Sequence, residues 1–444
     1  MRTSSIGRSR AGAYALTAVL CLLGLIAQPA AGAGTTSRAK SGYIVVLRPG
    51  SSPASIAVAH GVPLDDTYSA ALNGFATELT SAQARALRLA PSVVSVTRER
   101  TFAATHVPQV TTRAIRRVGG DASSTISGDG SGTVAANIAV LDTGIDGRSD
   151  DLNIGGGYNC FKPLHPSTKA MRDPNGHGTF VAGVAAAIDN GIDVVGIAPG
   201  ASVWSIRVLN SNGNGTTRTV LCGLDWAIAT RTDTDPANDI TVVNMSLGGP
   251  GTDDGACGTL NHDPVHQAVC SAAAHGIVVV AGAGNDSAPL ESFIPATYSE
   301  VLTATGIQDT DGQPGASGPN SLDPGCDMPI GDDVAASFSN YATSAGDLNH
   351  MLAAPATCVS SLGTDNRVAV GYGTSFATPN IAGVAALCIA HGDCAGLTPA
   401  QIIDKLVTDA AAYNTANPGY GFQGDPQHPV AGKGYGNLVR AAIY

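Results

Sequence analysis

Three residue types that together can break a peptide or ester bond stand in separate segments of the chain. Ser375 lies in Gly-Thr-Ser-Phe-Ala-Thr-Pro at the start of an apolar stretch, His177 lies in Asn-Gly-His-Gly-Thr, and Asp142 ends the run Asn-Ile-Ala-Val-Leu-Asp. A serine hydroxyl is a poor nucleophile in water, and it needs a neighbouring base and donors that stabilise an oxyanion. A histidine held by a carboxylate is such a base, so the three residues predict nucleophilic catalysis.

The order of the three residues along the chain narrows the chemistry. Asp142, His177 and Ser375 follow one another at separations of 35 and 198 positions. Taken alone, Asp-Thr-Gly after a strand is a common turn and Gly-His-Gly a common loop. Gly-Thr-Ser-x-Ala-Thr-Pro is rarer, and the three segments in this order argue against coincidence. Ala377 stands two positions after the serine, so the Gly-x-Ser-x-Gly motif of esterases and lipases is absent.

From about Val107 to Tyr444 the chain resembles the subtilisin-like (S8) serine peptidases, whose catalytic residues come in this order. The likeness includes Asn-Met-Ser-Leu-Gly-Gly at 244–249 and Val-Val-Val-Ala-Gly-Ala-Gly-Asn at 278–285. It implies an α/β fold, a three-layer sandwich around a mostly parallel sheet, and peptide-bond hydrolysis by an Asp142–His177–Ser375 triad. It also implies that the Asn285 amide and the Ser375 backbone N–H hold the oxyanion.

The same resemblance implies where protein or peptide substrates bind. Asn212-Gly213-Asn214-Gly215 is similar to the strand edge that pairs with one side of an extended peptide substrate. The residues after the strand that ends at 245 are similar to the segment that lines its other side. A substrate that adds to this edge as a strand is held through its backbone groups, so the resemblance implies broad specificity for the substrate's side chains. The implied substrate-binding residues are Ser246, Leu247, Gly248, Gly213, Asn214, Gly215 and Gly284. The chain departs from the usual family pattern at Phe180, Gly282 and Ala356.

A structural calcium ion is a further implication of the resemblance. The segment 188–194 has the length and position of the family's calcium loop, and Asp151 occupies the matching upstream carboxylate position. Calcium takes six to eight oxygens, many of them backbone carbonyls, so a short loop and a carboxylate suit it. The alternative is an ordinary polar turn. The implied ligands are Asp151, Ile188, Asn190, Ile192 and Val194.

The N-terminus has the pattern of an export signal. Arg2, Arg8 and Arg10 precede an apolar run from Ala15 to Ala27, which is short for a membrane span, and Ala-Gly-Ala at 31–33 offers a cleavage site. We therefore expect a signal peptide over 1–33 and a secreted, extracellular product with no membrane association after its removal. A retained membrane anchor is the alternative.

A compact block follows, from Gly42 to about Phe102. Strands are expected at 43–47, 71–79 and 92–97, with a helix over 80–89. This pattern resembles the I9-type propeptide inhibitor domain of the family, and a small regulatory or accessory domain is the alternative. We expect a propeptide over 34–104, with an end between 98 and 112, and a peptidase domain over 105–444. The propeptide would then be a partner of the enzyme, as inhibitor and folding aid.

Within the peptidase region, apolar strands alternate with helices. Strands are expected at 203–209, 240–245, 277–281 and 301–305, and helices at 220–228 and 267–275. Such alternation predicts a parallel sheet covered by helices, with the active site beyond the carboxyl ends of the strands. Thr398 begins a capping box with Pro399 at the first helical position, which predicts a last helix.

The chain has nine cysteines, of which Cys21 leaves with the signal peptide. An even number in an exported protein argues for disulfides, but eight cysteines allow 105 pairings. Closeness and family likeness suggest Cys257–Cys270 and Cys388–Cys394, from which Cys160–Cys222 and Cys326–Cys358 follow. The alternative for one pair is a zinc site formed by Cys257, His262, His266 and Cys270.

Composition excludes other classes of partner. The chain is 43% hydrophobic and 13% charged, and its 35 Asp and Glu exceed its 24 Lys and Arg, with the surplus after Thr105. An acidic body argues against nucleic acid or an anionic membrane as partner. We expect a monomeric, secreted, self-processing serine endopeptidase. An esterase or lipase and a non-catalytic binding relative are the competing hypotheses.

Overall fold

The computed structural model describes residues 40–104, 113–161, 172–318, 331–365 and 367–444. The expected signal peptide and residues 105–112, part of the range 98–112 in which the propeptide was expected to end, lie outside these ranges. Within the described part, no helix combines the length and apolar character that a membrane crossing requires.

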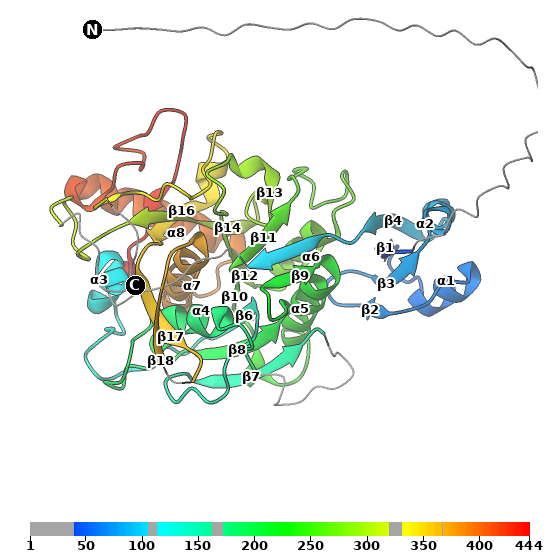
Figure 1. Ribbon diagram of the computed structural model, residues 1–444, viewed down its shortest axis with the longest axis horizontal. Helices are drawn as coiled ribbons and strands as arrows, with labels where there is room; N and C mark the ends of the chain where they lie inside the picture. Colours follow the sequence, from blue (N-terminus) through cyan, green and yellow to red (C-terminus); the bar gives the residue numbers. More distant parts are fainter. Residues whose placement is uncertain (1–39, 105–112, 162–171, 319–330, 366) are drawn as a thin grey trace, which may run out of the picture. The chain divides into compact units, whose positions relative to one another are not determined.

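Residues 41–98 form a small antiparallel sheet with two helices (Figure 1). The strand order is β2-β3-β1-β4, and both helices pack on one face. The second helix lies in the range where one was expected, and Thr80 and Gln83 form a capping box at its start. The first helix was not expected, although Ser52 caps it and Pro53 opens it. The elements are β1 (Ser41–Leu47), α1 (Pro53–His60), β2 (Asp66–Tyr68), β3 (Gly74–Leu79), α2 (Ser81–Arg88) and β4 (Val93–Arg98).

The central sheet follows the order β19-β16-β14-β12-β10-β6-β8-β7, and these neighbours are parallel. Only the short β15, which pairs antiparallel with β14, breaks the pattern within the described residues. The expected mostly parallel α/β fold is confirmed. Its strands are β6 (Asn137–Asp142), β7 (Ile154–Asn159), β8 (Ser202–Arg207), β10 (Val242–Met245), β12 (Val278–Gly282), β14 (Val301–Gln308), β15 (Val334–Ala335), β16 (Met351–Pro355) and β19 (Asn437–Leu438).

Helices cover both faces of this sheet, because its strands are apolar on both sides. Alternate residues of β6 show the division: Ile138 and Val140 pack with α4, α7 and α8, whereas Ala139 and Leu141 pack with α5 and α6. The result is a three-layer sandwich (Figure 1). The helices are α3 (Arg113–Val118), α4 (His177–Ala186), α5 (Thr217–Thr230), α6 (Pro264–Ala274), α7 (Thr374–His391) and α8 (Pro399–Ala416). Short 3-10 helices lie at Gly120–Ala122, Pro236–Asn238, Leu290–Ser292, Asp347–His350, Pro418–Tyr420 and Ala441–Ile443.

A second, smaller sheet joins the N-terminal block to the body. Its order is β13-β11-β5-β9, and the inner strand β5 is the segment that directly follows the N-terminal sheet. Ala104 pairs with Leu247 and Ala103 with Gly248 on one side, and Phe102 pairs with Gly215 on the other. The strands are β5 (Thr101–Ala104), β9 (Asn214–Thr216), β11 (Leu247–Pro250) and β13 (Phe293–Ile294), while β17 (Val359–Gly363) and β18 (Arg367–Gly371) form a separate hairpin.

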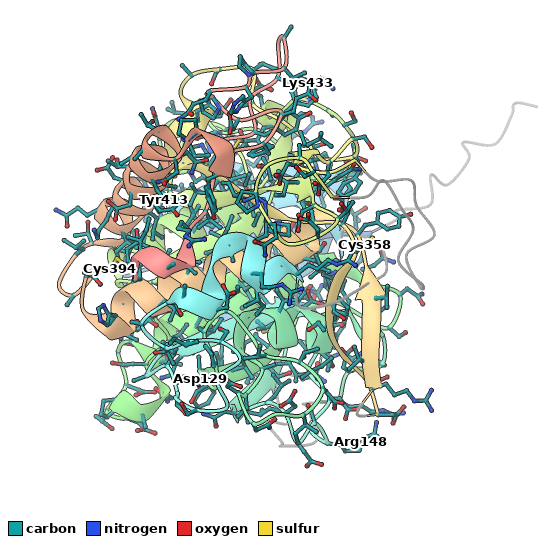
Figure 2. The ribbon with its side chains drawn as sticks, turned by 90° about the vertical axis from the view of Figure 1, so that its left-hand side faces the viewer. Asp129, Arg148, Cys358, Cys394, Tyr413 and Lys433 are labelled. Carbon is teal, nitrogen blue, oxygen red and sulfur yellow. A yellow bond between two sulfur atoms is a disulfide. The ribbon has the colours of Figure 1, made fainter. Side chains whose placement is uncertain are left out.

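Disulfides join Cys160 to Cys222, Cys257 to Cys270 and Cys388 to Cys394. These are three of the four suggested pairs: two came from closeness and family likeness, and Cys160–Cys222 followed from them. Cys326, a member of the fourth suggested pair, lies outside the described residues. The third bond closes the turn after α7, where Cys394 is labelled in Figure 2. Cross-links of this kind stabilise a fold mainly by restricting the unfolded chain.

Candidate active site

Asp142 is the last residue of β6, at the carboxyl edge of the parallel sheet. It is fully buried, and its Oδ1 also accepts a hydrogen bond from the backbone N–H of Thr143 at 2.6 Å. The neighbouring strands β10 and β12 lead to Ser246 and Asn285 at the same edge. The sheet therefore gathers residues that are far apart in sequence, as parallel topology requires.

His177 is the first residue of α4, and its Nδ1 lies 2.8 Å from Oδ1 and 2.9 Å from Oδ2 of Asp142. Contact this close requires a glycine next to the histidine. A Cβ on Gly178 would lie 2.1 Å from the carbonyl oxygen of Gly144 and 3.1 Å from Cβ of Asp142. Donation of an Nδ1 proton to this carboxylate would fix the tautomer in which Nε2 carries the lone pair.

Ser375 is the second residue of α7, in the first turn, where backbone N–H groups have no acceptor within the helix itself. Its carbonyl oxygen accepts a 2.7 Å hydrogen bond from the Ser246 hydroxyl, which ties the helix start to the end of β10. The Phe376 ring lies 4.3 Å from that of Phe180 and 5.6 Å from that of His177. These contacts hold α4 and α7 together, the two helices that carry the histidine and the serine.

The side chain of Asn285 has its two ends in different surroundings. Its Oδ1 accepts from the backbone N–H of Thr374 at 2.8 Å and from the Thr374 hydroxyl at 3.1 Å. Its Nδ2 is buried and has no hydrogen-bond partner among the described residues. The Asn285 amide is therefore held through its oxygen, and its Nδ2–H groups can donate to a molecule that binds at this site.

The expected substrate-binding segments flank strand β5. Leu247 and Gly248 belong to β11, and Asn214 and Gly215 belong to β9. Gly213 lies one residue before β9 and donates its backbone N–H to the carbonyl of Asn210. Strands β9 and β11 lie on either side of β5, so these two strands can hold an extended peptide between them by backbone hydrogen bonds alone.

Comparison with known proteins decides the family. The model described as "Subtilase family" matches residues 133–423, more than half of the chain, and the model described as "Peptidase inhibitor I9" matches residues 42–104. The chain belongs to the subtilase family.

Relatives at moderate identity support the same assignment. M-protease of Shouchella clausii (strain KSM-K16) is 35% identical over 310 residues, which cover 70% of this chain and 67% of the relative. Subtilisin Savinase of Lederbergia lenta is 37% identical over 250 residues, or 56% and 74% of the two chains. Subtilisin NAT of Bacillus subtilis subsp. natto is 34% identical over 276 residues, or 62% and 60%. The protein is a subtilisin-like serine endopeptidase with an I9 propeptide domain.

In this subtilase, no pattern in the sequence points to the position of Phe293. A Cβ added to Gly248 would lie 2.2 Å from Cε1 of the Phe293 ring, and one added to Gly284 would lie 3.0 Å from the same atom. The ring edge therefore fills the space between β11, an expected substrate-binding strand, and the segment that leads to Asn285. Strand β13 holds the ring there, because Phe293 pairs with Pro250.

Contacts between the I9 domain and the body were also not expected from sequence. The Asp225 carboxylate on α5 accepts hydrogen bonds from the backbone N–H groups of Ser69, Ala70 and Ala71, at 3.3, 2.6 and 2.7 Å. Arg218, two turns earlier on the same helix, pairs with Glu99 at 3.0 Å. Ile44 and Val46 of β1 join the apolar cluster of α5 and α6. The propeptide sheet therefore docks on these two helices.

The surroundings of Asp151, one of the expected calcium ligands, suit a bound cation. Asp151 is buried, its Oδ1 lies 2.8 Å from Nδ2 of Asn190, and its Oδ2 has no hydrogen-bond partner among the described residues. Burial raises the pKa of Asp151 to about 6, and the nearby carboxylates of Asp193 and Asp189 act in the same direction. A buried carboxylate with an unused oxygen, next to a loop rich in carbonyl groups, is a fitting environment for calcium.

The suggested zinc tetrad does not form in this structure. Cys257 and Cys270 are joined in a disulfide, so they offer no thiolate. The group of potential ligand side chains around them contains His266 and Glu300 and does not contain His262, whose carbonyl oxygen accepts a hydrogen bond from Thr97.

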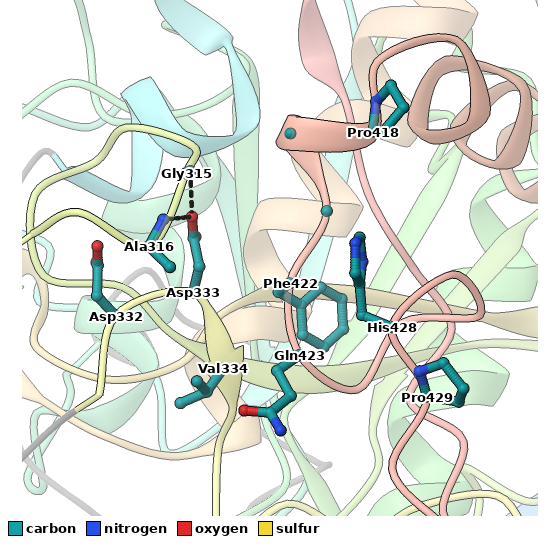
Figure 3. A pocket seen from close by; sticks show the side chains of 12 residues that line it. Gly315, Ala316, Asp332, Asp333, Val334, Pro418, Phe422, Gln423, His428 and Pro429 are labelled. Carbon is teal, nitrogen blue, oxygen red and sulfur yellow. Dashed lines mark hydrogen bonds between the residues drawn. The ribbon is translucent and has the colours of Figure 1, made fainter.

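A pocket of about 590 Å³ lies elsewhere, between residues 315–316 and 332–334 on one side and the segment 418–429 on the other (Figure 3). Its walls include Phe422, Gln423 and His428, and Asp333 there accepts from the backbone of Gly315 and Ala316. None of the expected catalytic or substrate-binding residues lines it.

Proposed function

We propose that Ser375 is the nucleophile that attacks the scissile carbonyl. His177 takes the Oγ proton through Nε2 and then returns it to the leaving amine. Asp142, with both oxygens within 2.9 Å of Nδ1, fixes the tautomer and stabilises the imidazolium that forms. Full burial of Asp142 strengthens this interaction because water does not screen it.

The oxyanion of the tetrahedral intermediate is held by the Nδ2 group of Asn285 and the backbone N–H of Ser375. The hydrogen bonds of Thr374 to Oδ1 support this role, since they orient the amide before substrate arrives. A pre-oriented donor needs no reorganisation as charge develops, which is why it acts on the transition state.

The substrate lies as an extended strand between β9 and β11, where β5 lies in the unprocessed chain. The side chain that precedes the cleaved bond points into the space beside Gly248 and Gly284, which the Phe293 ring narrows. We therefore propose a preference for small side chains at this position.

The chain is made as an exported zymogen that cleaves itself. Strand β5 ends at Ala104, opposite Leu247, and the next residue of the wall is Ser246, which contacts Ser375. The cut is proposed to fall within residues 105–112, so the mature enzyme begins there. Residues 1–33 direct export, and the mature product acts outside the cell as a monomer.

The propeptide blocks the cleft until it is removed. Asp225 and Arg218 hold its sheet on α5 and α6, and β5 occupies the substrate strand position. Its docking on two helices of the body also explains a role in folding, because it brings the two helices together before the rest is complete.

Calcium is proposed as a structural ligand. The Asp151 carboxylate, the Asn190 side chain and the backbone carbonyls of Ile188, Ile192 and Val194 would hold it. A bound cation would neutralise the buried carboxylate and stabilise the loop 188–194.

The 2.8 Å contact between His177 and Asp142 carries the proposal, and replacement of Ser375 tests it. In Ser375→Ala, kcat on a peptide should fall by several orders of magnitude, with a residual rate about 10³–10⁴ above that in water. Expressed in a host without other subtilases, this protein should keep its propeptide attached, whereas the parent should lose it, as mass spectrometry would show. Normal turnover would remove Ser375 as the nucleophile. Correct cleavage would remove only the self-processing step.

A further inference from the structure

The loop between β11 and α6 brings two carboxylates to one nitrogen of a fully buried histidine. His266 lies in the first turn of α6 and is 0% exposed. Its Nδ1 is 3.6 Å from Oδ1 of Asp253 and 3.5 Å from Oδ1 of Asp254, and these ligand atoms lie within 4.8 Å of one another. No hydrogen-bond partner for Nδ1 exists among the described residues.

The opposite side of the ring is already held. Nε2 of His266 lies 2.9 Å from Oε2 of Glu300, and the ring stacks on Tyr298 with centroids 4.0 Å apart and planes within 1°. Donation of the Nε2 proton to a carboxylate leaves the Nδ1 lone pair available. In metal sites, a ligating histidine is regularly oriented by such a carboxylate at its other nitrogen.

The spacing of the ligand atoms suits a metal better than a direct contact. Separations of 3.5 and 3.6 Å exceed a normal N–H···O hydrogen bond. Ligands at about 2.0–2.2 Å from a tetrahedral ion are separated by about 3.4 Å. A small contraction of the loop would therefore place an ion at bonding distance from all three atoms.

Charge and access also favour a cation. Asp253, Asp254 and Glu300 surround the imidazole, and the ion pairs found in the described part of the chain join them to His266 and to no lysine or arginine. Asp254 is fixed by the backbone N–H groups of Ala256, Gly258, Leu260 and Asn261. Asp253 lines an open pocket of about 500 Å³, which offers a path from solvent.

We propose that Nδ1 of His266, with Asp253 and Asp254, binds a divalent transition ion of the zinc class, with water completing its coordination. Imidazole with carboxylates suits zinc, whereas calcium takes oxygen ligands only, so this site is distinct from the one at Asp151. The ion is structural. It ties the loop after the substrate-binding strand β11 to α6 and to Glu300.

Thermal unfolding of the full-length Ser375→Ala protein, which cannot digest itself, tests the proposal. Calcium is kept saturating, and zinc is added to about 100-fold over its Kd, where a single site should raise Tm by about 3 °C. His266→Asn and Asp253→Asn on this background should lose the rise. His391→Asn is the matched control, because His391 and Asp393 form an exposed pair 2.6 Å apart. The His391→Asn protein should keep the full rise in Tm on addition of zinc.

Zinc-edge anomalous scattering from crystals of the same protein gives a second readout. A peak within bonding distance of Nδ1 of His266 is expected. If His266→Asn does not fold, Asp253→Asn alone decides, since Asn can still accept the Gly255 hydrogen bond that Asp253 accepts now. An equal zinc effect in Asp253→Asn and its parent, or no zinc effect at all, would overturn the proposal and leave His266 as a buried partner of Glu300 alone.

Discussion

The backbone N–H of Thr374 donates a 2.8 Å hydrogen bond to Oδ1 of Asn285, joining the residue before the candidate nucleophile to the candidate oxyanion donor. One contact thus sets two positions at once: the start of α7 and the direction of the Asn285 NH₂ group. Because the amide oxygen is engaged, the nitrogen is the end that remains for a substrate.

Asn285→Ala is expected to lower kcat roughly 10²–10³-fold with KM little changed, because the donor acts only as negative charge develops. Steady-state kinetics on a peptide substrate measures both constants. Thr374→Val removes the weaker 3.1 Å bond to Oδ1 and the acceptor of the Gly284 backbone N–H, but it keeps the backbone bond to Oδ1, so its effect on kcat should be much smaller. A change in KM alone would contradict the oxyanion role.

Phe293→Gly should widen the space beside Gly248 and Gly284. We expect kcat/KM for peptides with a large apolar side chain before the cleaved bond to rise by about 10–200-fold, the usual range for apolar pocket changes. Peptides with alanine there serve as the internal control and should change little. A digest of a peptide library by both enzymes measures the ratio. A parent enzyme that already prefers large side chains would refute the assignment of Phe293.

Asp225→Ala should weaken the propeptide as an inhibitor. The carboxylate takes three backbone hydrogen bonds from residues 69–71, and a hydrogen bond to a charged group contributes about 1.5–3 kcal/mol. The inhibition constant of a separate 34–104 chain should therefore rise roughly 10–100-fold against the mature enzyme. Asp235→Ala, an exposed aspartate outside this contact, is the control. Equal inhibition of both variants would show that the contact is dispensable.

Stability should depend on pH through Asp151. Burial raises the pKa of its carboxyl to about 6 from the ordinary aspartate value of 3.8, so the folded state binds this proton more tightly than the unfolded one. The resulting stabilisation is complete below pH about 4 and is lost as pH rises through about 6. Calcium competes with the same proton, so the rise in Tm that it causes should grow between about pH 5 and pH 7.

Calorimetry with calcium and with a chelator, at a series of pH values, measures both trends. Asp151→Asn should flatten the pH dependence near 6 and remove most of the calcium effect. An unchanged Tm on chelation in parent and variant alike would mean that the loop 188–194 is an ordinary turn.

The sequence alone determined the class of chemistry and the architecture. Ser375, His177 and Asp142 each lie in a short segment, and the residue types and order of these segments indicate nucleophilic catalysis. The alternation of apolar strands and helices is also a local pattern, and the structure contains it. The capping box predicted at Thr398 forms, because it depends only on residues three positions apart. Local patterns of this kind need no knowledge of the rest of the molecule.

Tertiary structure decided the features that depend on contacts between distant segments. Nothing near Phe293 in sequence shows that its ring meets Gly248 and Gly284, and nothing near Asp225 shows that it holds residues 69–71, more than 150 positions away. His266 appeared in sequence as one of four possible zinc ligands, but the two cysteines of that set are joined in a disulfide. The fold instead places Asp253 and Asp254 near Nδ1 of His266 and Glu300 at its Nε2. Such partners are chosen by chain topology, because parallel strands and crossing helices bring together residues that local patterns do not connect.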